Sequence, residues 1–230
     1  MSKNFCNQQE IPEKTSPGTK NYLFPNGIIV GIGGPSAVGK STIIDRLSQT
    51  CNAAQAYSVT TRPLRGPEDK RKPVTIEEYQ RMLDSKELIE GVIYEGHGYG
   101  ISRTAVSEIL SRGQIAILDC NQAGMEQLLQ TDLAPTVVTI FLVCSAEEVL
   151  RRQLARAAGT RESQLSRLYS SLQEIEGARS SGIFQFVVRN DNVDAAVTKI
   201  IRIIEGKNGE SDYFNVDAFK QDMTALLERL

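Results

Sequence analysis

One eight-residue stretch carries the clearest chemical pattern in the chain. Residues 34–41 read Gly-Pro-Ser-Ala-Val-Gly-Lys-Ser and match G-x-x-x-x-G-K-S/T in full. Residues 28–32 before it form a short apolar run that predicts a buried strand, and residues 40–47 after it show the apolar spacing of a helix. Small residues between strand and helix let backbone N–H groups turn inward around phosphate oxygens. The stretch therefore predicts a nucleoside triphosphate site of the P-loop type.

Side chains at the end of this loop suit phosphoryl transfer. Lys40 can reach the β- and γ-phosphates, so we expect it to be catalytic, and the Ser41 hydroxyl can bind Mg²⁺. Asp119 follows a predicted buried strand, where a carboxylate can complete the Mg²⁺ shell or, alternatively, cap the next helix. The residues expected to hold the triphosphate are Gly34, Pro35, Ser36, Ala37, Val38, Gly39, Lys40, Ser41 and Thr42.

Strands and helices that could position these residues alternate along the chain. Further strands are predicted at residues 56–59, 88–94, 115–118, 137–143 and 184–188. Helices are predicted at residues 75–83, 102–113, 122–129 and 195–204, with others opening at Ser145 and after Thr160. This alternation indicates a three-layer α/β fold of the P-loop NTPase type, with a mainly parallel sheet and helices on both faces.

Composition excludes several other classes of protein. The 26 Lys and Arg against 28 Asp and Glu leave a net charge of −2, which disfavours general nucleic-acid binding. Four cysteines without a C-x-x-C pair, and the lone His97, give no zinc pattern and suit a reducing compartment. The longest apolar run, at 137–144, is too short to span a membrane, and the N-terminus lacks a signal-peptide profile. We therefore expect a cytoplasmic protein without nucleic-acid or membrane partners.

The segment after the P-loop suggests what receives the phosphoryl group. Residues 58–68 read Ser-Val-Thr-Thr-Arg-Pro-Leu-Arg-Gly-Pro-Glu, and here the chain begins to resemble the guanylate kinase family. The likeness continues through Glu90, Gly-x-x-Tyr-Gly at 96–100, Ile-Leu-Asp at 117–119 and Asn-Asp at 190–191, and so covers about residues 27–205. The resemblance implies a nucleoside monophosphate kinase that transfers the γ-phosphoryl group of ATP to GMP, with Mg²⁺ as cofactor.

The resemblance also implies a set of acceptor-site residues. Arg62 and Arg65 stand where the family holds the GMP phosphate, and two guanidiniums can grip one dianion from two sides. Glu90 would accept from N1–H and the N2 amino group of guanine, neither of which adenine offers. The implied GMP-binding set is Ser58, Arg62, Arg65, Glu90, Tyr99 and Asn121. A solvated loop or an ordinary packed side chain is the alternative at each position, most of all at Ser58.

An arginine-rich stretch at 151–167 resembles the lid of the family. Such a lid would close over ATP and stabilise charge on the transferred phosphoryl group. We expect Arg156 and Arg167 to be catalytic, together with Lys40 and Arg62, whereas Arg151 or Arg161 would lie on a solvated helical face.

The expected domain organisation combines these parts. Residues 1–24 are predicted to be a flexible tail, and residues 25–207 a guanylate-kinase-like domain. Within that domain, an acceptor-binding subdomain is expected at about 57–104 and a helical lid at about 151–167. Residues 208–230 form a predicted linker and an amphipathic helix. We expect this helix to pack on the core, with a dimer contact as the alternative, so a monomer and a homodimer both stay open.

Four departures from the family pattern fall mainly on the acceptor side. Residues 69–73 lack the tyrosine that touches the acceptor phosphate in the family, and one hypothesis is that a lysine replaces it. Ile101 stands where the family has Ser or Thr, and Asn121 where it has Asp. The lid is stretched at 156–160, and Gln153 replaces a common Arg.

These departures leave two alternatives to GMP phosphorylation. One is a related kinase with another acceptor, such as a modified purine nucleotide or a sugar bisphosphate. The other is a guanylate-kinase-like module that binds protein partners, against which the complete P-loop argues.

Overall fold

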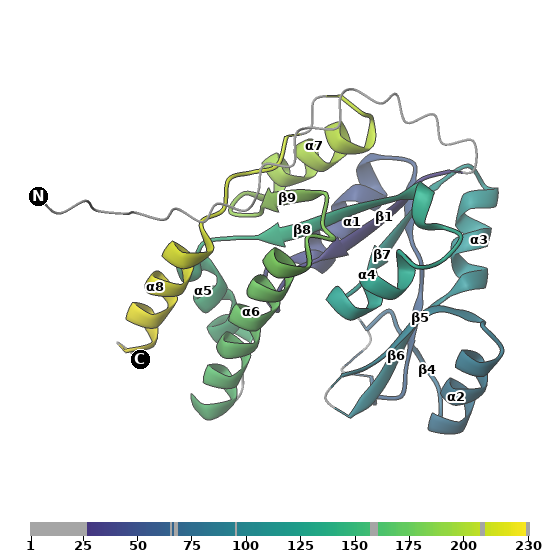
Figure 1. Cartoon of the computed structure of the whole chain (residues 1–230), viewed down its shortest axis with the longest axis horizontal. Coiled ribbons are helices and arrows are strands. Elements are labelled where there is room, and N and C mark those ends of the chain that lie inside the picture. Colours follow the sequence, from purple (N-terminus) through teal and green to yellow (C-terminus); the bar gives the residue numbers. More distant parts are fainter. Residues whose placement is uncertain are drawn as a thin grey trace, which may run out of the picture.

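The computed structural model describes residues 27–64, 66, 69–94, 96–156, 161–207 and 210–228, without the side chains of 156 and 161–165. Its larger sheet has five strands in the described residues, all paired in parallel. Their order is β2 (Ala53–Gln55), β7 (Ile115–Asp119), β1 (Ile29–Gly33), β8 (Val137–Val143) and β9 (Phe186–Arg189). The P-loop therefore follows the central strand (Figure 1).

Helices cover both faces of this sheet, as the three-layer prediction requires. Val30 and Ile32 of β1 belong to a core cluster with α1 (Lys40–Thr50) and α7 (Val193–Ile204). Gly31 faces the other way, where an added Cβ would lie 2.5 Å from Met125 of α4 (Gln122–Leu128). The helix α3 (Arg103–Ser111) contributes to the cluster on that second face, and the short turn η1 (Ala134–Thr136) leads into β8. Fold class and layer order are thus as predicted.

The last helix, α8 (Val216–Leu227), packs on the protein rather than standing apart. Phe219 and Met223 are buried in the same cluster as side chains of α5 (Ala146–Arg156) and α6 (Arg161–Ser181). Lys220 also forms an ion pair with Glu176 of α6. No helix among the described residues combines the length and the apolarity that a membrane span needs.

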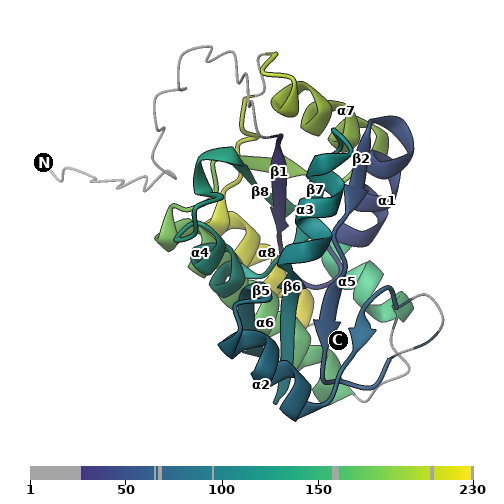
Figure 2. The same cartoon turned by 90° about the vertical axis from the view of Figure 1, so that its right-hand side faces the viewer.

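A second, smaller sheet lies beside the first one (Figure 2). Its order is β4 (Lys72–Pro73), β3 (Ser58–Thr60), β6 (His97–Ser102) and β5 (Leu88–Tyr94), with β6 antiparallel to both β3 and β5. Helix α2 (Ile76–Asp84) covers one face, where Tyr79 and Met82 are buried with Val59 and Leu88. Gly98 permits this packing, because an added Cβ there would lie 2.8 Å from the Tyr79 ring. The opposite face remains for the candidate acceptor residues.

The prediction of a single strand at 56–59 is wrong. The chain instead leaves the large sheet after β2 and enters the small sheet at β3. The Ala56 N–H still donates to Ile117 of β7 (3.0 Å), whereas the Tyr57 carbonyl accepts from Ser102 at the end of β6 (3.4 Å). Two neighbouring residues therefore bond to different sheets, which a propensity pattern cannot reveal.

Other boundaries follow the predictions more closely. Thr75, Ser102 and Ser145 each accept a hydrogen bond from the backbone N–H three residues later, so the expected helix starts are confirmed. The strand predicted at 184–188 runs instead from Phe186 to Arg189. The lone histidine, His97, begins β6.

Candidate nucleotide-binding site

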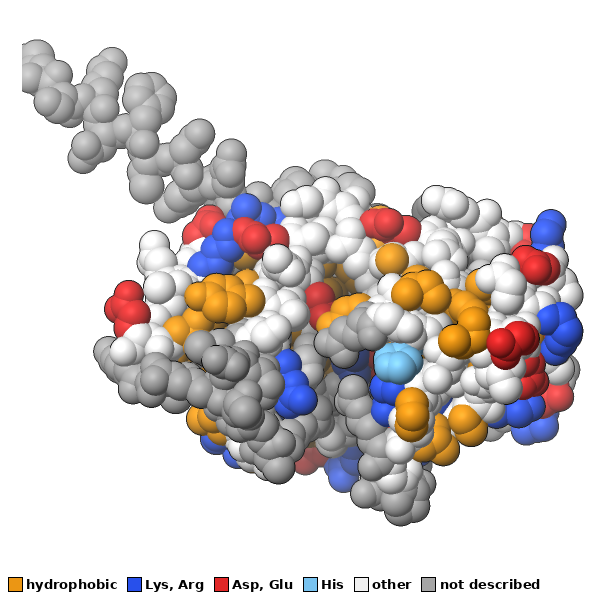
Figure 3. Space-filling view, turned by 90° about the horizontal axis from the view of Figure 1, so that it is seen from below, with side chains coloured by type: hydrophobic (Ala, Val, Ile, Leu, Met, Phe, Trp, Pro, Cys, Tyr) orange, Lys and Arg blue, Asp and Glu red, His pale blue; other side chains and the backbone are white. Residues whose placement is uncertain are grey.

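Two parts of the molecule project from the same side of the large sheet. Helix α6 and the small sheet with α2 extend in the same direction (Figure 1). Seen from below, the surface between them is hollowed (Figure 3). The P-loop follows β1 and Asp119 ends β7, and both strands belong to the sheet from which the two parts project. The hollow is the candidate site.

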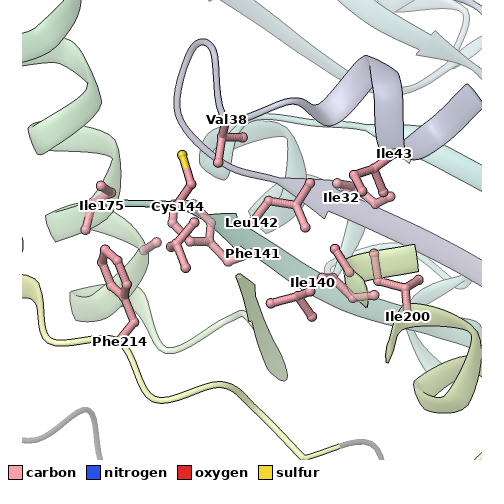
Figure 4. Close-up of a cluster of buried hydrophobic side chains, with 14 of the residues drawn as sticks. Ile32, Val38, Ile43, Ile140, Phe141, Leu142, Cys144, Ile175, Ile200 and Phe214 are labelled. Carbon is pink, nitrogen blue, oxygen red and sulfur yellow. The ribbon is translucent and has the colours of Figure 1, made fainter. Parts of the chain in front are cut away.

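The P-loop has backbone geometry that only small residues tolerate. Gly34, Ala37 and Gly39 have positive φ values of 143°, 67° and 99°. A Cβ on Gly34 would also lie 2.7 Å from the carbonyl oxygen of Leu142, which cannot move aside. Val38 is fully buried and packs beside Leu142 and Cys144 (Figure 4). Val38 therefore anchors the loop, and the small residues around it permit the positive φ values.

The predicted triphosphate residues 34–42 form this loop and the first turn of α1. Lys40 bends back over the loop, where its Nζ donates to the carbonyls of Gly34 and Pro35. Ser36, Ser41 and Thr42 are exposed. Because the first N–H groups of an α-helix have no carbonyl partner inside the helix, this end attracts anions. The structure thus brings together the donors that phosphate oxygens need.

Two side chains from distant segments brace the loop from outside. The Val38 carbonyl accepts from Arg152 Nη1 (2.8 Å) and from Asn190 Nδ2 (2.8 Å). Arg152 also donates to the Asn190 carbonyl (2.9 Å) and to Glu148 (2.6 Å). A Cβ on Gly39 would lie 2.5 Å from Asn190 Nδ2, so the glycine makes room for the brace. The sequence singled out neither residue for this role, although Glu148 and Arg152 have the i, i+4 spacing of an ion pair.

The side-chain oxygen of Asn190 is not used in the brace. The side chain is buried, and its Oδ1 has no hydrogen-bond partner among the described residues.

Glu148, which holds Arg152 in place, is ionised because hydrogen bonds from Arg151 first, and then Arg152, lower its pKa to about 2. The guanidinium of Arg152 is therefore fixed by a carboxylate at one end and directed at backbone carbonyls at the other.

Two carboxylates from different elements, Asp119 and Glu174, lie close enough to influence each other. Asp119 ends β7 and pairs in register with Ile32 of β1, directly before the P-loop. Burial raises the pKa of Glu174 on α6, the charge of Lys40 lowers it, and the charge of Asp119 raises it further. Glu174 was not predicted, and no local pattern in its long helix marks it. The cap of α4 is Asn121, whose Oδ1 accepts from Gly124 (2.9 Å), so Asp119 does not serve as that cap.

These residues fit a magnesium ion held mainly by substrate. The described residues contain no cluster of three or more His, Cys, Asp or Glu side chains that could hold a metal alone. Mg²⁺ in nucleotide sites commonly takes only one or two protein ligands, with phosphates and waters filling the rest. Ser41 and Asp119 offer a hydroxyl and a carboxylate, and a cation would relieve the repulsion between Asp119 and Glu174.

The acceptor candidates form two cross-strand rows on the small sheet. Ser58 of β3 lies opposite Ile101 of β6, which lies opposite Glu90 of β5. The next row along the strands contains Thr60, Tyr99 and Val92 in the same order. Residues directly opposite share a face, and successive rows on one face are about 7 Å apart. Ser58, Glu90 and Tyr99 therefore lie on the face that α2 does not cover.

Glu90 is buried against the start of α4. Glu90 is only 6% exposed, and a Cβ added to Gly124 would lie 2.6 Å from Glu90 Oε2. Burial raises the pKa of Glu90 to about 7, a hydrogen bond from the Ile101 backbone opposes this, and the Asp119 charge adds to it. Asn121 contacts the same glycine position, since the added Cβ would be 3.5 Å from its Oδ1. The structure thus brings Glu90 and Asn121 together.

Arg62 lies beyond the second row, close to Tyr99. It donates to Asp69 (2.6 Å) and to the Pro63 carbonyl (2.6 Å). Burial alone would lower the pKa of Arg62, but hydrogen bonding with Asp69 and Tyr99 outweighs that effect and raises it. Arg71, which the sequence did not single out, lies over the Tyr99 ring at 5.7 Å from its centre. Arg65 lies outside the described residues.

The expected lid residues are placed only in part. Arg156 is the last residue of α5, and its side chain lies outside the description, while Arg167 is exposed on α6. Gln153, where the family commonly has an arginine, is buried and donates to Ser171 of α6 (3.2 Å). This glutamine joins the two helices of the expected lid rather than facing ligand.

A parallel sheet with a complete P-loop after its central strand defines the class of P-loop nucleotide-binding proteins. The family model of guanylate kinase matches residues 27–207 of this chain. The chain belongs to the guanylate kinase family.

Similar proteins agree with that membership. Guanylate kinase from Sus scrofa is 33% identical over 173 residues, which cover 73% of this chain and 86% of the relative. Guanylate kinase from Homo sapiens is 32% identical over 176 residues, which cover 74% of this chain and 89% of the relative. A crystal structure of guanylate kinase from Anaplasma phagocytophilum superposes with a TM-score of 0.62 at 24% identity, covering 79% of this chain and 86% of that one, and shows the shared fold.

Proposed function

We propose that the protein transfers the γ-phosphoryl group of ATP to GMP and so forms ADP and GDP. The observation that carries this proposal is the set of polar side chains on the face of the small sheet that α2 does not cover. A buried carboxylate, Glu90, shares one sheet face with Ser58 and Tyr99, and Arg62 lies at the phosphate end of that face. On this proposal, recognition of the base and recognition of the phosphate would be separated along a single surface.

On the donor side, residues 34–42 would wrap the phosphates of ATP. Lys40 would leave the loop carbonyls it now contacts and bind the β- and γ-phosphates. Ser41 and Asp119 would hold Mg²⁺, which supplies charge neutralisation at the triphosphate. Arg152 and Asn190 would keep the loop in its binding shape, because both donate to the Val38 carbonyl.

On the acceptor side, Glu90 would read the guanine edge. Its carboxylate would accept from N1–H and the N2 amino group, so it must be ionised when GMP is bound. Ser58 lies in the same row and would donate to the guanine O6, and Asn121 would contact the base from the start of α4. Adenine would leave the buried carboxylate unpaired, which is the basis of the expected selectivity.

The transfer itself requires positioning and charge stabilisation. An oxygen of the GMP phosphate would attack the γ-phosphorus in line, while the bond from that phosphorus to the oxygen of the β-phosphate breaks. Arg62, Arg65 and Tyr99 would orient the GMP phosphate. Arg156 and Arg167 would stabilise charge on the moving group as residues 151–167 close as a lid towards the acceptor subdomain at 57–104.

A coupled assay of ADP release tests this function. The purified chain is incubated with Mg·ATP and, separately, GMP, dGMP, IMP, AMP or UMP. We expect turnover with GMP and dGMP and much less with IMP, which lacks the N2 amino group. A preference for AMP or UMP would refute the acceptor assignment. ATP binding without turnover of any nucleotide would favour the interaction module, and a Lys40→Met protein purified in parallel controls for contaminating kinases.

A further inference from the structure

Arg71 occupies a defined position at the phosphate end of the acceptor face. It precedes β4, and its guanidinium carbon lies 5.7 Å from the centre of the Tyr99 ring. Its Nη1 donates to Asp69 Oδ1 (3.1 Å), and its backbone N–H donates to the same oxygen (3.3 Å). Backbone, guanidinium and ring contacts together hold this arginine over Tyr99.

Asp69 aligns Arg71 with Arg62. Its carboxylate is buried, with 4% of the side chain exposed, and its two oxygens receive different arginines, Arg62 at Oδ2 (2.6 Å) and Arg71 at Oδ1 (3.1 Å). Two guanidiniums and one carboxylate leave an excess of one positive charge in this trio. Arg62 Nε is buried without a hydrogen-bond partner among the described residues, so an unused donor is also present. The cluster is electrostatically matched to an added anion.

We propose that Arg71 binds the phosphate of the acceptor nucleotide together with Arg62 and Tyr99. This role rests on the proposed function, because it assumes a nucleoside monophosphate on the small sheet. The row of Tyr99 lies next to the row of Glu90 on the same face. A nucleotide whose base meets Glu90 would therefore extend its phosphate towards Tyr99 and Arg71.

The neighbouring lysines are directed elsewhere, so the hypothesis of a lysine contact is not the one the geometry favours. Lys70 forms an exposed ion pair with Asp45 of α1, and Lys72 is exposed on β4. Arg71 is the basic side chain of the segment 69–73 that lies against Tyr99. An arginine here adds a positive charge and a planar pair of donors to the phosphate site.

Direct binding measurements separate this role from a structural one. Arg71→Ala, Arg71→Lys and the matched control Lys72→Ala are compared with the unchanged chain by calorimetry, using GMP and guanosine as probes. Guanosine has the same base and sugar but no phosphate. We expect Arg71→Ala to weaken GMP binding about 10- to 100-fold and to leave guanosine binding within about twofold. Arg71→Lys should recover part of the loss, and Lys72→Ala should bind like the unchanged chain.

Three results would overturn the proposal. They are equal losses for GMP and guanosine with Arg71→Ala, no loss with that variant, or an equal loss with Lys72→Ala. Thermal unfolding of each variant and its binding of an ATP analogue show that the fold and the P-loop are intact.

The outcome is separable from that of the proposed function. If the unchanged chain phosphorylates GMP but Arg71→Ala binds GMP normally, only the role of Arg71 fails. If the chain prefers another nucleoside monophosphate and Arg71→Ala weakens that nucleotide but not its nucleoside, the GMP assignment fails and the role of Arg71 stands.

Discussion

The donor and acceptor halves of the site are built in different ways. The donor half is one continuous stretch, residues 34–42, whose shape depends on small residues with positive φ values and on the brace from Arg152 and Asn190. The acceptor half collects single side chains from separate segments, among them Ser58, Glu90 and Tyr99. A continuous loop fails as a unit when one residue changes, whereas a collected site can exchange one member and keep the rest.

The departures from the family pattern fit that contrast. Ile101 takes the middle position between Ser58 and Glu90, is 1% exposed, and packs in a cluster with Ile89 and Val106. Asn121 has become the cap of α4. Each substitution is absorbed by local packing or hydrogen bonding, and Glu90 retains its buried position beside them. The comparison predicts that donor-side changes impair all turnover, while acceptor-side changes alter the use of GMP alone.

The largest effect is expected from Lys40→Met. Loss of the charge that we propose contacts the transferred phosphoryl group should lower kcat about 10²- to 10³-fold with every acceptor. Steady-state kinetics measure this change, and Lys207→Met, an exposed lysine paired with Glu205, is the control that should keep full activity. A loss confined to GMP would contradict the separation of the two halves.

Glu90→Gln should impair GMP use selectively. The amide keeps the size of the side chain but faces two guanine donors with one acceptor oxygen and an amino group of its own. We expect kcat/KM for GMP to fall about 100-fold, with KM for ATP within about twofold of normal. Glu87→Gln, three residues earlier and exposed beside Arg81, should behave as the unchanged chain. Unaltered GMP turnover in Glu90→Gln would remove the base-reading role.

The pKa of Glu90 predicts a pH dependence with a definite sign. Because burial raises that pKa to about 7, the ionised form that guanine needs grows about tenfold between pH 6 and pH 8. GMP binding should strengthen accordingly in calorimetry, and this gain should be absent from Glu90→Gln, which also corrects for titration of the GMP phosphate. A matching gain in the variant would assign the pH dependence to another group.

Stability should change with pH in the opposite direction. The unfolded chain releases the Glu90 proton near the ordinary value of 4.5, but the folded chain holds it up to about pH 7. The contribution of Glu90 to the free energy of unfolding is therefore fully present below pH 4.5 and is lost as the pH rises through 7. For a shift of this size, the loss is on the order of 3 kcal/mol. Denaturant unfolding of the unchanged chain and Glu90→Gln between pH 5 and pH 8 measures the difference.

Gly124→Ala should displace Glu90 without removing it. The new Cβ would stand 2.6 Å from Glu90 Oε2, so the carboxylate must shift away from its position at the start of α4. We expect about a fivefold loss in kcat/KM for GMP, since part of one charged hydrogen bond is lost. The matched helix glycine is Gly177, where the added Cβ would meet the flexible end of Gln122 instead. If Gly177→Ala lowers GMP use equally, a general packing defect is responsible.

The smallest effect is expected from Arg152→Lys. Lysine cannot donate to the Val38 and Asn190 carbonyls in the forked geometry of arginine, so the brace on the P-loop weakens. KM for ATP should rise about threefold while KM for GMP stays unchanged, because Asn190 still holds Val38. Arg151→Lys, which alters the neighbouring exposed arginine, is the control. A change in the GMP constant instead would couple the brace to the acceptor half.

By itself, the sequence determined the features that depend on neighbouring residues. The P-loop, the alternation of strands and helices, and the capped starts at Thr75, Ser102 and Ser145 all follow from local spacing and residue type. It also marked Arg62 and Glu90 through a resemblance spread over most of the chain. The roles of the site residues themselves remain predictions for the experiments above.

Only the tertiary structure decided what depends on pairing between distant segments. The division of 56–59 between two sheets, the row that joins Ser58, Ile101 and Glu90, and the stacking of Arg71 on Tyr99 all require the register of strands far apart in sequence. The brace of Val38 likewise joins residues more than a hundred positions apart. Local spacing states which way a side chain points within its own element, but only the packed fold decides which partner it meets.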